Sequence, residues 1–209
     1  MKNRSPFTSF FLITLLVTLV TVTRAETPAE RATRAGELVT LKNHRVLRLW
    51  SADVKERGFA HGFFLAEEIR DDFAAALNSL PNFGAARFEA MLLPWASTKF
   101  EWDADAAAEL DGIYEGMQAR LGAGGMKSKT LERALRREDL NAINVIADYF
   151  GPACSGFSAW VKRTVNGEVV QGRTLDFPLG PKPVADQVIL VYEALPARGK
   201  DRPARTAWV

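Results

Sequence analysis

The spacing of apolar residues changes along the chain and separates three regions. Residues 10–22 form one apolar or Thr/Ser-rich stretch. Between residues 56 and 150, apolar side chains recur at helical spacing, as Phe59 and Phe63 do. From residue 157 onward the period becomes two, which is typical of strands. The pattern predicts an α+β protein in which helices precede most of the strands.

Proline, glycine and capping residues set the expected helix boundaries. Pro81 and Pro94 each follow an apolar periodic segment, and we expect a helix to end before each of them. Asp103 is a good N-cap for a third helix, and Gly122 stops it. Gly151 ends a fourth. The helices are expected over residues 56–80, 85–93, 103–121 and 129–150, after a loose or helical segment at 26–37 and a half-exposed strand at 45–50.

The strand region opens with a hairpin signal. Asn166-Gly167 separates alternating segments at residues 157–165 and 168–173. An Asn-Gly pair supplies the two positive φ angles of a type I′ turn, so we expect a two-residue turn. Further strands are expected at residues 188–192 and 205–209, continuing the same sheet. Because that sheet is left without a helical cover, we expect the chain to be a truncated form of its fold.

The first 25 residues have the layout of a secretory signal peptide. Lys2 and Arg4 precede the apolar stretch. The small residues Thr23 and Ala25 stand three and one positions before the expected cleavage site, which follows Ala25. The apolar stretch covers 13 residues, whereas a membrane-spanning helix needs about 20. We therefore expect cleavage after Ala25, a secreted or periplasmic protein, and no stable membrane span afterwards.

Charge and histidine content exclude two classes of partner. The whole chain carries a formal charge of +2, and the three basic residues of the first 25 account for that excess. Basic and acidic residues otherwise alternate, so we expect no nucleic-acid partner. The two histidines, His44 and His61, lie far from the single cysteine, so no zinc-type spacing exists, and we expect no metal and no cofactor.

Cys154 is the single cysteine in the sequence. It cannot form an intramolecular disulfide, and an exported thiol is exposed to oxidation, so it is either a small buried side chain or a reactive group. A nucleophilic thiol needs a base. Cleavage between Ala153 and Cys154 would create an α-amino group with a pKa of roughly 7.7–8.0 on the same residue. The small and rigid residues 151–153 are compatible with that cleavage.

Arg173 and Asp176 are the other candidate site residues. Pairing about the predicted turn places Arg173 opposite Trp160 and Asp176 opposite Phe157. Arg173 then shares a face with Cys154, whereas Asp176 needs a bend in the strand. A guanidinium would favour the thiolate, and a carboxylate would hold the new ammonium group. An ordinary surface ion pair around a turn explains the same spacing, and both interpretations stay open.

These residues carry a resemblance to a known family. The segments CSGFSAW at 154–160, NG at 166–167 and GRTLDF at 172–177 resemble the start of the catalytic subunit of N-terminal-nucleophile (Ntn) hydrolases. The similarity is greatest to the peptidase C45 group of acyl-CoA:6-aminopenicillanic acid acyltransferase-like proteins, which has choloylglycine hydrolases, acid ceramidases and phospholipase B-like proteins as relatives. The segments ERGFAHG at 56–62 and ELDGIYEG at 109–116 are similar to the propeptide-side helices of that group.

The resemblance implies an αββα sandwich and self-cleavage before Cys154. It implies amide hydrolysis or acyl transfer on a small-molecule substrate through a thioester, with Arg173 and Asp176 in orienting positions. It also implies a signal peptide at 1–25, a mainly helical propeptide or α-subunit region at 26–153, and the start of a catalytic β-subunit at 154–209, with pairing of the two subunits after cleavage. The family's downstream asparagine, which completes the oxyanion hole, has no counterpart here.

Two further functions remain open from the sequence. One is a phospholipase B-like or ceramidase-like lipid hydrolase that uses the same cysteine. The other is a non-catalytic exported binding fragment in which Cys154 is buried. We interpret His61 as a packed or capping residue, and the aromatic residues Trp95, Phe100 and Trp102 as core residues in preference to an acyl pocket.

Overall fold

The computed structural model describes residues 24–80, 82–151, 156–173, 185–193 and 207–208. It is a mixed α+β structure, as the sequence predicts. The helices are α1 (Pro28–Ala35), α2 (Val54–Phe64), α3 (Ala66–Ser79), α4 (Gly84–Arg87), the π-helix η1 (Phe88–Leu92), α5 (Leu93–Lys99), α6 (Ala104–Gly125), α7 (Arg137–Asn144) and α8 (Ile146–Phe150). The strands are β1 (Gly36–Leu41), β2 (His44–Leu49), β3 (Gly156–Val161), β4 (Gly167–Arg173), β5 (Val188–Tyr192) and β6 (Ala207–Trp208). In the described part of the chain, no helix has the length and apolar character needed to cross a membrane.

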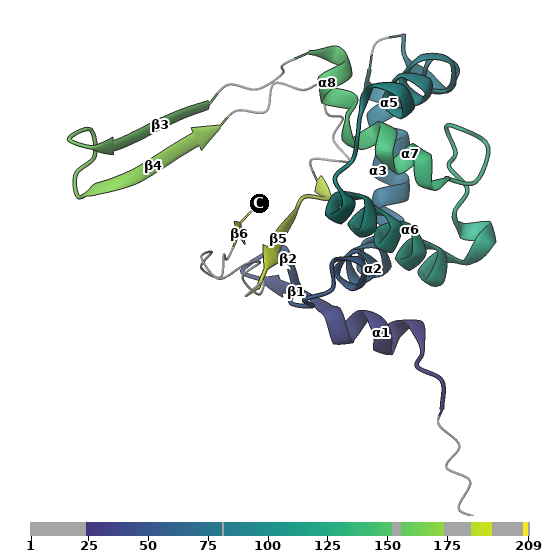
Figure 1. Ribbon diagram of the computed structural model, residues 1–209, viewed down its shortest axis with the longest axis horizontal. Helices are drawn as coiled ribbons and strands as arrows, with labels where there is room; N and C mark the ends of the chain where they lie inside the picture. Colours follow the sequence, from purple (N-terminus) through teal and green to yellow (C-terminus); the bar gives the residue numbers. More distant parts are fainter. Residues whose placement is uncertain (1–23, 81, 152–155, 174–184, 194–206, 209) are drawn as a thin grey trace, which may run out of the picture.

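The strands form two separate sheets. One has four strands in the order β1-β2-β5-β6, in which β2 and β5 are parallel and the other neighbours are antiparallel. The other consists of β3 and β4 alone and projects from the rest of the molecule (Figure 1). The prediction that all strands after residue 157 continue one sheet is therefore wrong. Strand β5 instead pairs with β2, because its Val188 and Leu190 extend the apolar face that β2 presents to the helices.

Three apolar clusters lie in the described core, and the smallest of them, formed by Ala32, Phe59 and Phe63, joins α1 to α2. The larger cluster lies among the helices and contains the fully buried Leu77, Phe88, Leu92, Met117 and Leu135. The second cluster joins the sheet to α2 and is formed by Ala35, Leu47, Leu49, Ala60 and Leu65. Figure 1 shows α2 between the strands and α6. The aromatic residues Trp95, Phe100 and Trp102 pack against the larger cluster, as expected.

Helices α2 and α6 cross at unusually short range because both carry two glycines four residues apart. A Cβ atom on Gly62 would lie 1.9 Å from the carbonyl oxygen of Ile113, and one on Gly116 would lie 2.2 Å from that of Phe59. A Cβ atom on Gly58 would likewise lie 2.1 Å from the carbonyl oxygen of Glu109, and one on Gly112 would lie 2.1 Å from that of Lys55. Small residues let two helix backbones approach this closely, so the four glycines fix the crossing.

Helices form in each region where the sequence predicts one, but several of their boundaries differ from the prediction. The predicted helix 56–80 is two helices, because Leu65 leaves helical geometry (φ −116°, ψ 24°) between them. The predicted end at Pro94 is wrong. The helix continues through η1 into α5, where Pro94 occupies the first turn and its missing N–H is tolerated. Asp103 caps α6 as predicted, and Gly122 (φ 65°) interrupts it.

The predicted helix 129–150 begins eight residues later, at Arg137. Before it, Lys127 and Ala134 form an isolated β-bridge, and the chain between them turns. Buried Asp139 explains the late start. It accepts hydrogen bonds from the Arg136 N–H at 2.7 Å and from both terminal nitrogens of Arg133 at 2.6 and 2.8 Å. These bonds hold the preceding segment outside the helix.

The β3–β4 hairpin forms, but not with a two-residue Asn166-Gly167 turn. The connection runs over residues 162–166, with positive φ at Val161 (53°) and Gly167 (72°). The Thr164 N–H donates to Val161 O, and the Thr164 hydroxyl lies 2.8 Å from the carbonyl oxygen of Glu168. These local bonds favour a wider loop than the Asn-Gly pair alone, and the strand register shifts between Ala159 and Val161.

Candidate functional site

Most of the candidate site predicted around the cysteine lies outside the described residues. This applies to Cys154, Ala153 and Asp176, and to the predicted signal sequence before Arg24. Arg173 is the last residue of β4, and its backbone pairs with Gly156. The prediction that it pairs with Trp160 is wrong, because the wider loop shifts the register. The corrected register pairs Arg173 with Gly156, which lies two residues after Cys154 in the sequence.

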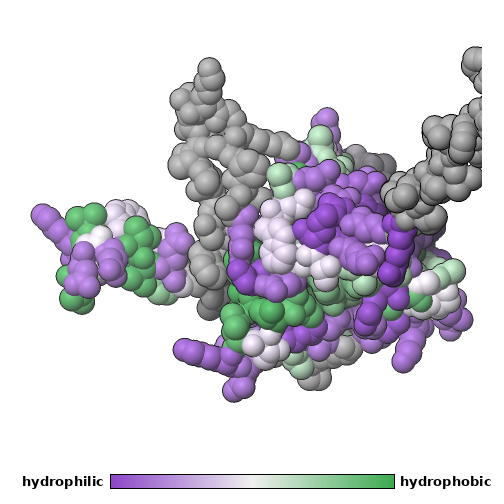
Figure 2. All heavy atoms as spheres, turned by 90° about the horizontal axis from the view of Figure 1, so that it is seen from below, coloured by the Kyte–Doolittle hydropathy of each residue, from purple (hydrophilic) through white to green (hydrophobic). Residues whose placement is uncertain are grey.

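The hairpin that leads from Cys154 to Arg173 exposes large apolar side chains. Phe157 and Trp160 are 66% and 56% exposed. Figure 2 shows apolar and polar residues side by side on this hairpin, at the left of the view. The Gln171 side-chain amide donates to the Ser158 hydroxyl at 3.2 Å across the two strands. A two-stranded ribbon with apolar groups on its surface is marginally stable alone, so this element is suited to packing against further structure.

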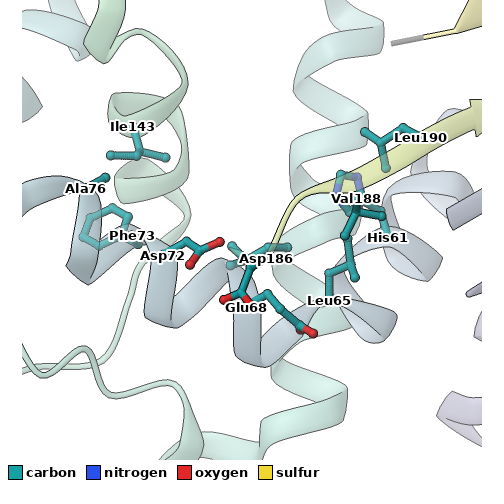
Figure 3. Close-up of a pocket in the computed structure, with 11 residues that line it drawn as sticks. His61, Leu65, Glu68, Asp72, Phe73, Ala76, Ile143, Asp186, Val188 and Leu190 are labelled. Carbon is teal, nitrogen blue, oxygen red and sulfur yellow. The ribbon is translucent and has the colours of Figure 1, made fainter. Parts of the chain in front are cut away.

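A second candidate site is a pocket of about 390 Å³ between α2, α3, α7 and the start of β5 (Figure 3). Its apolar walls are Leu65, Ile69, Phe73, Ala76, Ile143, Val188 and Leu190. Its polar lining consists of His61, Glu68, Asp72 and Asp186. Glu68 and Asp72 project from successive turns of α3 toward Asp186, and His61 lies beside Val188 and Leu190. The pocket therefore has an acidic part and a largely apolar part.

His61 is positioned by α2, and the residue as a whole is partly exposed. Its Nδ1 atom is buried and has no hydrogen-bond partner among the described residues. Burial lowers the pKa of His61 from 6.5 to about 4, because the charged imidazolium loses its hydration. The ring is therefore neutral at pH 7. It is a packed residue, as predicted from the sequence, but it also forms part of a pocket wall.

The acidic residues of the pocket are placed by α3 and by the loop before β5. Glu68 forms an ion pair with Arg45 of β2 at 2.5 Å, which joins α3 to the sheet. The far end of β5 is fixed as well, because the Tyr192 hydroxyl donates to Glu109 of α6 at 2.8 Å. Burial and the neighbouring Glu109 carboxylate raise the pKa of Tyr192, so its hydroxyl stays protonated as the donor.

Sequence reasoning missed this pocket. A signal was present, because His61, Leu65, Glu68 and Asp72 recur at spacings of three and four residues, which places them along one side of a helical segment. The contribution of β5 carried no comparable signal, since Asp186 and Val188 are more than 100 residues away in the sequence. Within the described ranges, no group of His, Cys, Asp and Glu side chains is arranged to hold a metal ion.

Comparison of the chain with family models, with curated proteins and with solved structures found no match.

Proposed function

We propose that the chain is an exported cysteine-type Ntn amidohydrolase or acyltransferase, which cleaves itself before Cys154 and acts on amide bonds. The observation that carries this proposal is the register of the β3–β4 hairpin. It pairs Arg173 with Gly156, and Gly156 lies two residues after Cys154. An extended chain over those two residues would put Cys154 on the same face as Arg173. A guanidinium close to the sulfur would stabilise a thiolate.

In the proposed chemistry, the nucleophilic thiol and the α-amino group that acts as its base both belong to Cys154. Self-cleavage transfers the acyl group of Ala153 from the Cys154 nitrogen to its sulfur, which frees the α-amino group. Water then hydrolyses that thioester and releases the Cys154 thiol and the Ala153 carboxylate. During turnover this amine accepts the thiol proton, and the thiolate attacks the substrate carbonyl. The C–N bond breaks, the leaving amine takes up the proton, and an acyl thioester remains. Water or an acceptor amine then releases the acyl group.

Arg173 and Asp176 have orienting roles in this proposal. A guanidinium near the sulfur favours the thiolate and pairs with a carboxylate of substrate or protein. The Asp176 carboxylate holds the α-ammonium group of Cys154 after it has accepted the proton. Residue types and spacing support these roles, together with the new register of Arg173.

The four-stranded sheet is compatible with an αββα sandwich, which is the architecture we propose. Helix α2 covers one face of this sheet. The opposite face has a groove of about 620 Å³. The apolar residues of its lining are Leu41, Val46, Ile189 and Val191, and the polar residues are Thr40, Lys42, His44, Arg48 and Glu193. A second sheet packs on such a face in a sandwich. The exposed apolar residues of the β3–β4 hairpin suit the start of that second sheet.

The two upstream segments that resemble the family's propeptide side contact each other directly. Residues 56–62 lie in α2 and residues 109–116 lie in α6, and their glycines form the close helix crossing. This contact supports a shared structural role for the two segments. A phospholipase B-like or ceramidase-like activity remains the alternative within the same chemistry, and assays against ceramides, bile-salt conjugates, penicillins and N-acyl amino acids separate these substrates.

The proposal is tested by substituting the nucleophile. We expect Cys154→Ala to abolish both chain cleavage and amide turnover. Cys154→Ser should cleave slowly and turn over substrate poorly, because an alcohol is a weak nucleophile without a strong base. Denaturing gels follow the cleavage and a chromogenic amide follows turnover. Efficient cleavage of the alanine variant would show that another protease cuts the chain and would contradict the proposal.

A further inference from the structure

Helix α8 ends at a glycine whose backbone conformation is closed to nearly all other residues. Gly151 has φ 90° and ψ 172°. This region of backbone space is occupied almost only by glycine, because a Cβ atom there clashes with the adjoining backbone. Packing does not require the glycine, since no described atom outside its chain neighbours lies within 4 Å of the place that a Cβ atom would occupy. The direction of the chain at this point is therefore what selects glycine.

Helix α8 is held in place by contacts with two other segments. The Tyr149 ring lies edge-on to the Trp95 ring of α5, with ring centroids 5.0 Å apart. The Phe150 ring meets that of Phe83, just before α4, in the same geometry at 5.1 Å. At the start of the helix, Ile146 is buried among the residues of the helical core. Edge-to-face ring pairs add to the stabilisation that burial gives, so the end of α8 has a fixed position.

The proposed cleavage site follows this fixed end closely. The bond between Ala153 and Cys154 is the third peptide bond after Gly151. Two residues span at most about 7 Å, so a change of direction at Gly151 is passed on to that bond over a very short distance. The proline at position 152 adds a constraint, because it disfavours helical geometry at the residue before it. The dihedral angles of Gly151 therefore set the direction in which the chain leaves α8 toward the bond.

We propose that Gly151 is a positioning residue for self-cleavage, and that its glycine-only conformation directs the bond between Ala153 and Cys154 toward the attacking thiol. This inference rests on the proposed cleavage before Cys154. In that step the sulfur bonds to the Ala153 carbonyl carbon, the C–N bond breaks, and the Cys154 nitrogen takes up the thiol proton. Attack within one chain depends on the alignment of the reacting atoms, so a misdirected chain slows the step even when both groups are intact.

The test compares two glycines that share this conformation. Gly122 in α6 has φ 65° and ψ 174°, and its Cβ position is open as well. Gly151→Ala and Gly122→Ala therefore impose the same kind of backbone strain, but only the first lies beside the proposed cleavage site in the sequence. The full chain is made by cell-free translation, and denaturing gels follow the cleaved fraction with time. We expect Gly151→Ala to cleave roughly tenfold to a hundredfold more slowly than the parent chain, and Gly122→Ala to cleave at the parent rate.

Two further measurements separate positioning from general damage to the fold. Both variants should shift the midpoint of urea unfolding by similar amounts, because the strain is similar. Turnover of a chromogenic amide, expressed per mole of N-terminal Cys154, should match the parent in the cleaved fraction of Gly151→Ala. The reason is that Gly151 is no longer joined to Cys154 once the bond is cut.

The outcomes distinguish this inference from the proposed function. Cleavage of Gly151→Ala at the parent rate, or equal slowing in Gly122→Ala, would overturn the role of Gly151 and leave self-cleavage at Cys154 standing. A folded parent chain that never cleaves itself would overturn both.

Discussion

At His61, burial sets the protonation state of one side chain and thereby the pH range in which the fold is most stable. The pKa of His61 is lowered from 6.5 to about 4 in the folded chain. The unfolded chain therefore binds a proton below pH 6.5 that the folded chain does not bind until about pH 4. Stability from this residue is fully present above the unfolded pKa and decreases as pH falls, by at most about 3 kcal/mol.

Urea unfolding at pH 7 and pH 4.5 measures this effect. In a His61→Leu variant the loss of unfolding free energy between the two pH values should be smaller than in the parent chain. His44 is exposed on β2, so His44→Leu should retain the parent's pH dependence. Equal pH dependence in all three chains would show that His61 is not desolvated.

Asp139 is the residue whose substitution should most disturb the start of α7. It is fully buried and accepts hydrogen bonds from Arg133 and from the Arg136 N–H. Asp139→Asn removes the charge and at least one acceptor, so we expect a loss of about 2–3 kcal/mol of unfolding free energy. Asp148→Asn changes an exposed carboxylate in α8 and should stay within about 0.5 kcal/mol. Denaturant unfolding of both variants checks the difference.

Individual residues were predictable where their role is local. The N-cap role of Asp103 follows from its type and position, and the helix break at Gly122 from its backbone freedom. The burial of Asp139 was not predictable, because it depends on Arg133 folding back before the helix. The new position of Arg173 depends in the same way on hydrogen bonds of Thr164 in the loop.

At the scale of elements, the crossing of α2 and α6 makes the sharpest prediction. Gly62→Ala would put a Cβ atom 1.9 Å from Ile113 O, which is backbone and cannot move aside alone. We expect the helices to be forced apart, with a loss of about 3 kcal/mol of unfolding free energy.

Gly124→Ala is the matched control, because nothing lies within 4 Å of its Cβ position in α6. There alanine should stabilise the chain by about 0.5–1 kcal/mol, since it restricts the unfolded backbone and favours the helix. Thermal unfolding of both variants checks the sign of each effect. A Gly62→Ala chain as stable as the parent would mean that the two helices are not in backbone contact.

Helices and strands were largely predictable as elements, but their partners were not. Apolar spacing predicted β5 and the single helical segment that forms α2 and α3, because local periodicity indicates which face is buried. The cap at Asp103 and the break at Gly122 predicted α6. The parallel pairing of β2 with β5 joins residues 45–49 to residues 188–192. No local pattern encodes such a distant pairing. The same limitation left the His61 pocket unpredicted, since one of its walls is β5.

For the whole molecule, the sequence predicted the α+β class and most of the order of helices and strands, but it did not predict β1. It did not predict that the first hairpin, β1–β2, and the last strands share one sheet. One face of that sheet carries a groove lined by apolar residues such as Leu41 and Ile189 and by charged residues such as Arg48 and Glu193. The proposed sandwich assigns a second sheet to this face.

The most direct measurement of the central claim is the intact mass of the purified, folded protein together with the N-terminal sequence of each fragment. Self-cleavage predicts two fragments that stay associated, one of which begins at Cys154, and a single uncut chain in Cys154→Ala. A folded parent protein that begins at Glu26 and remains one intact chain would contradict the proposed Ntn mechanism.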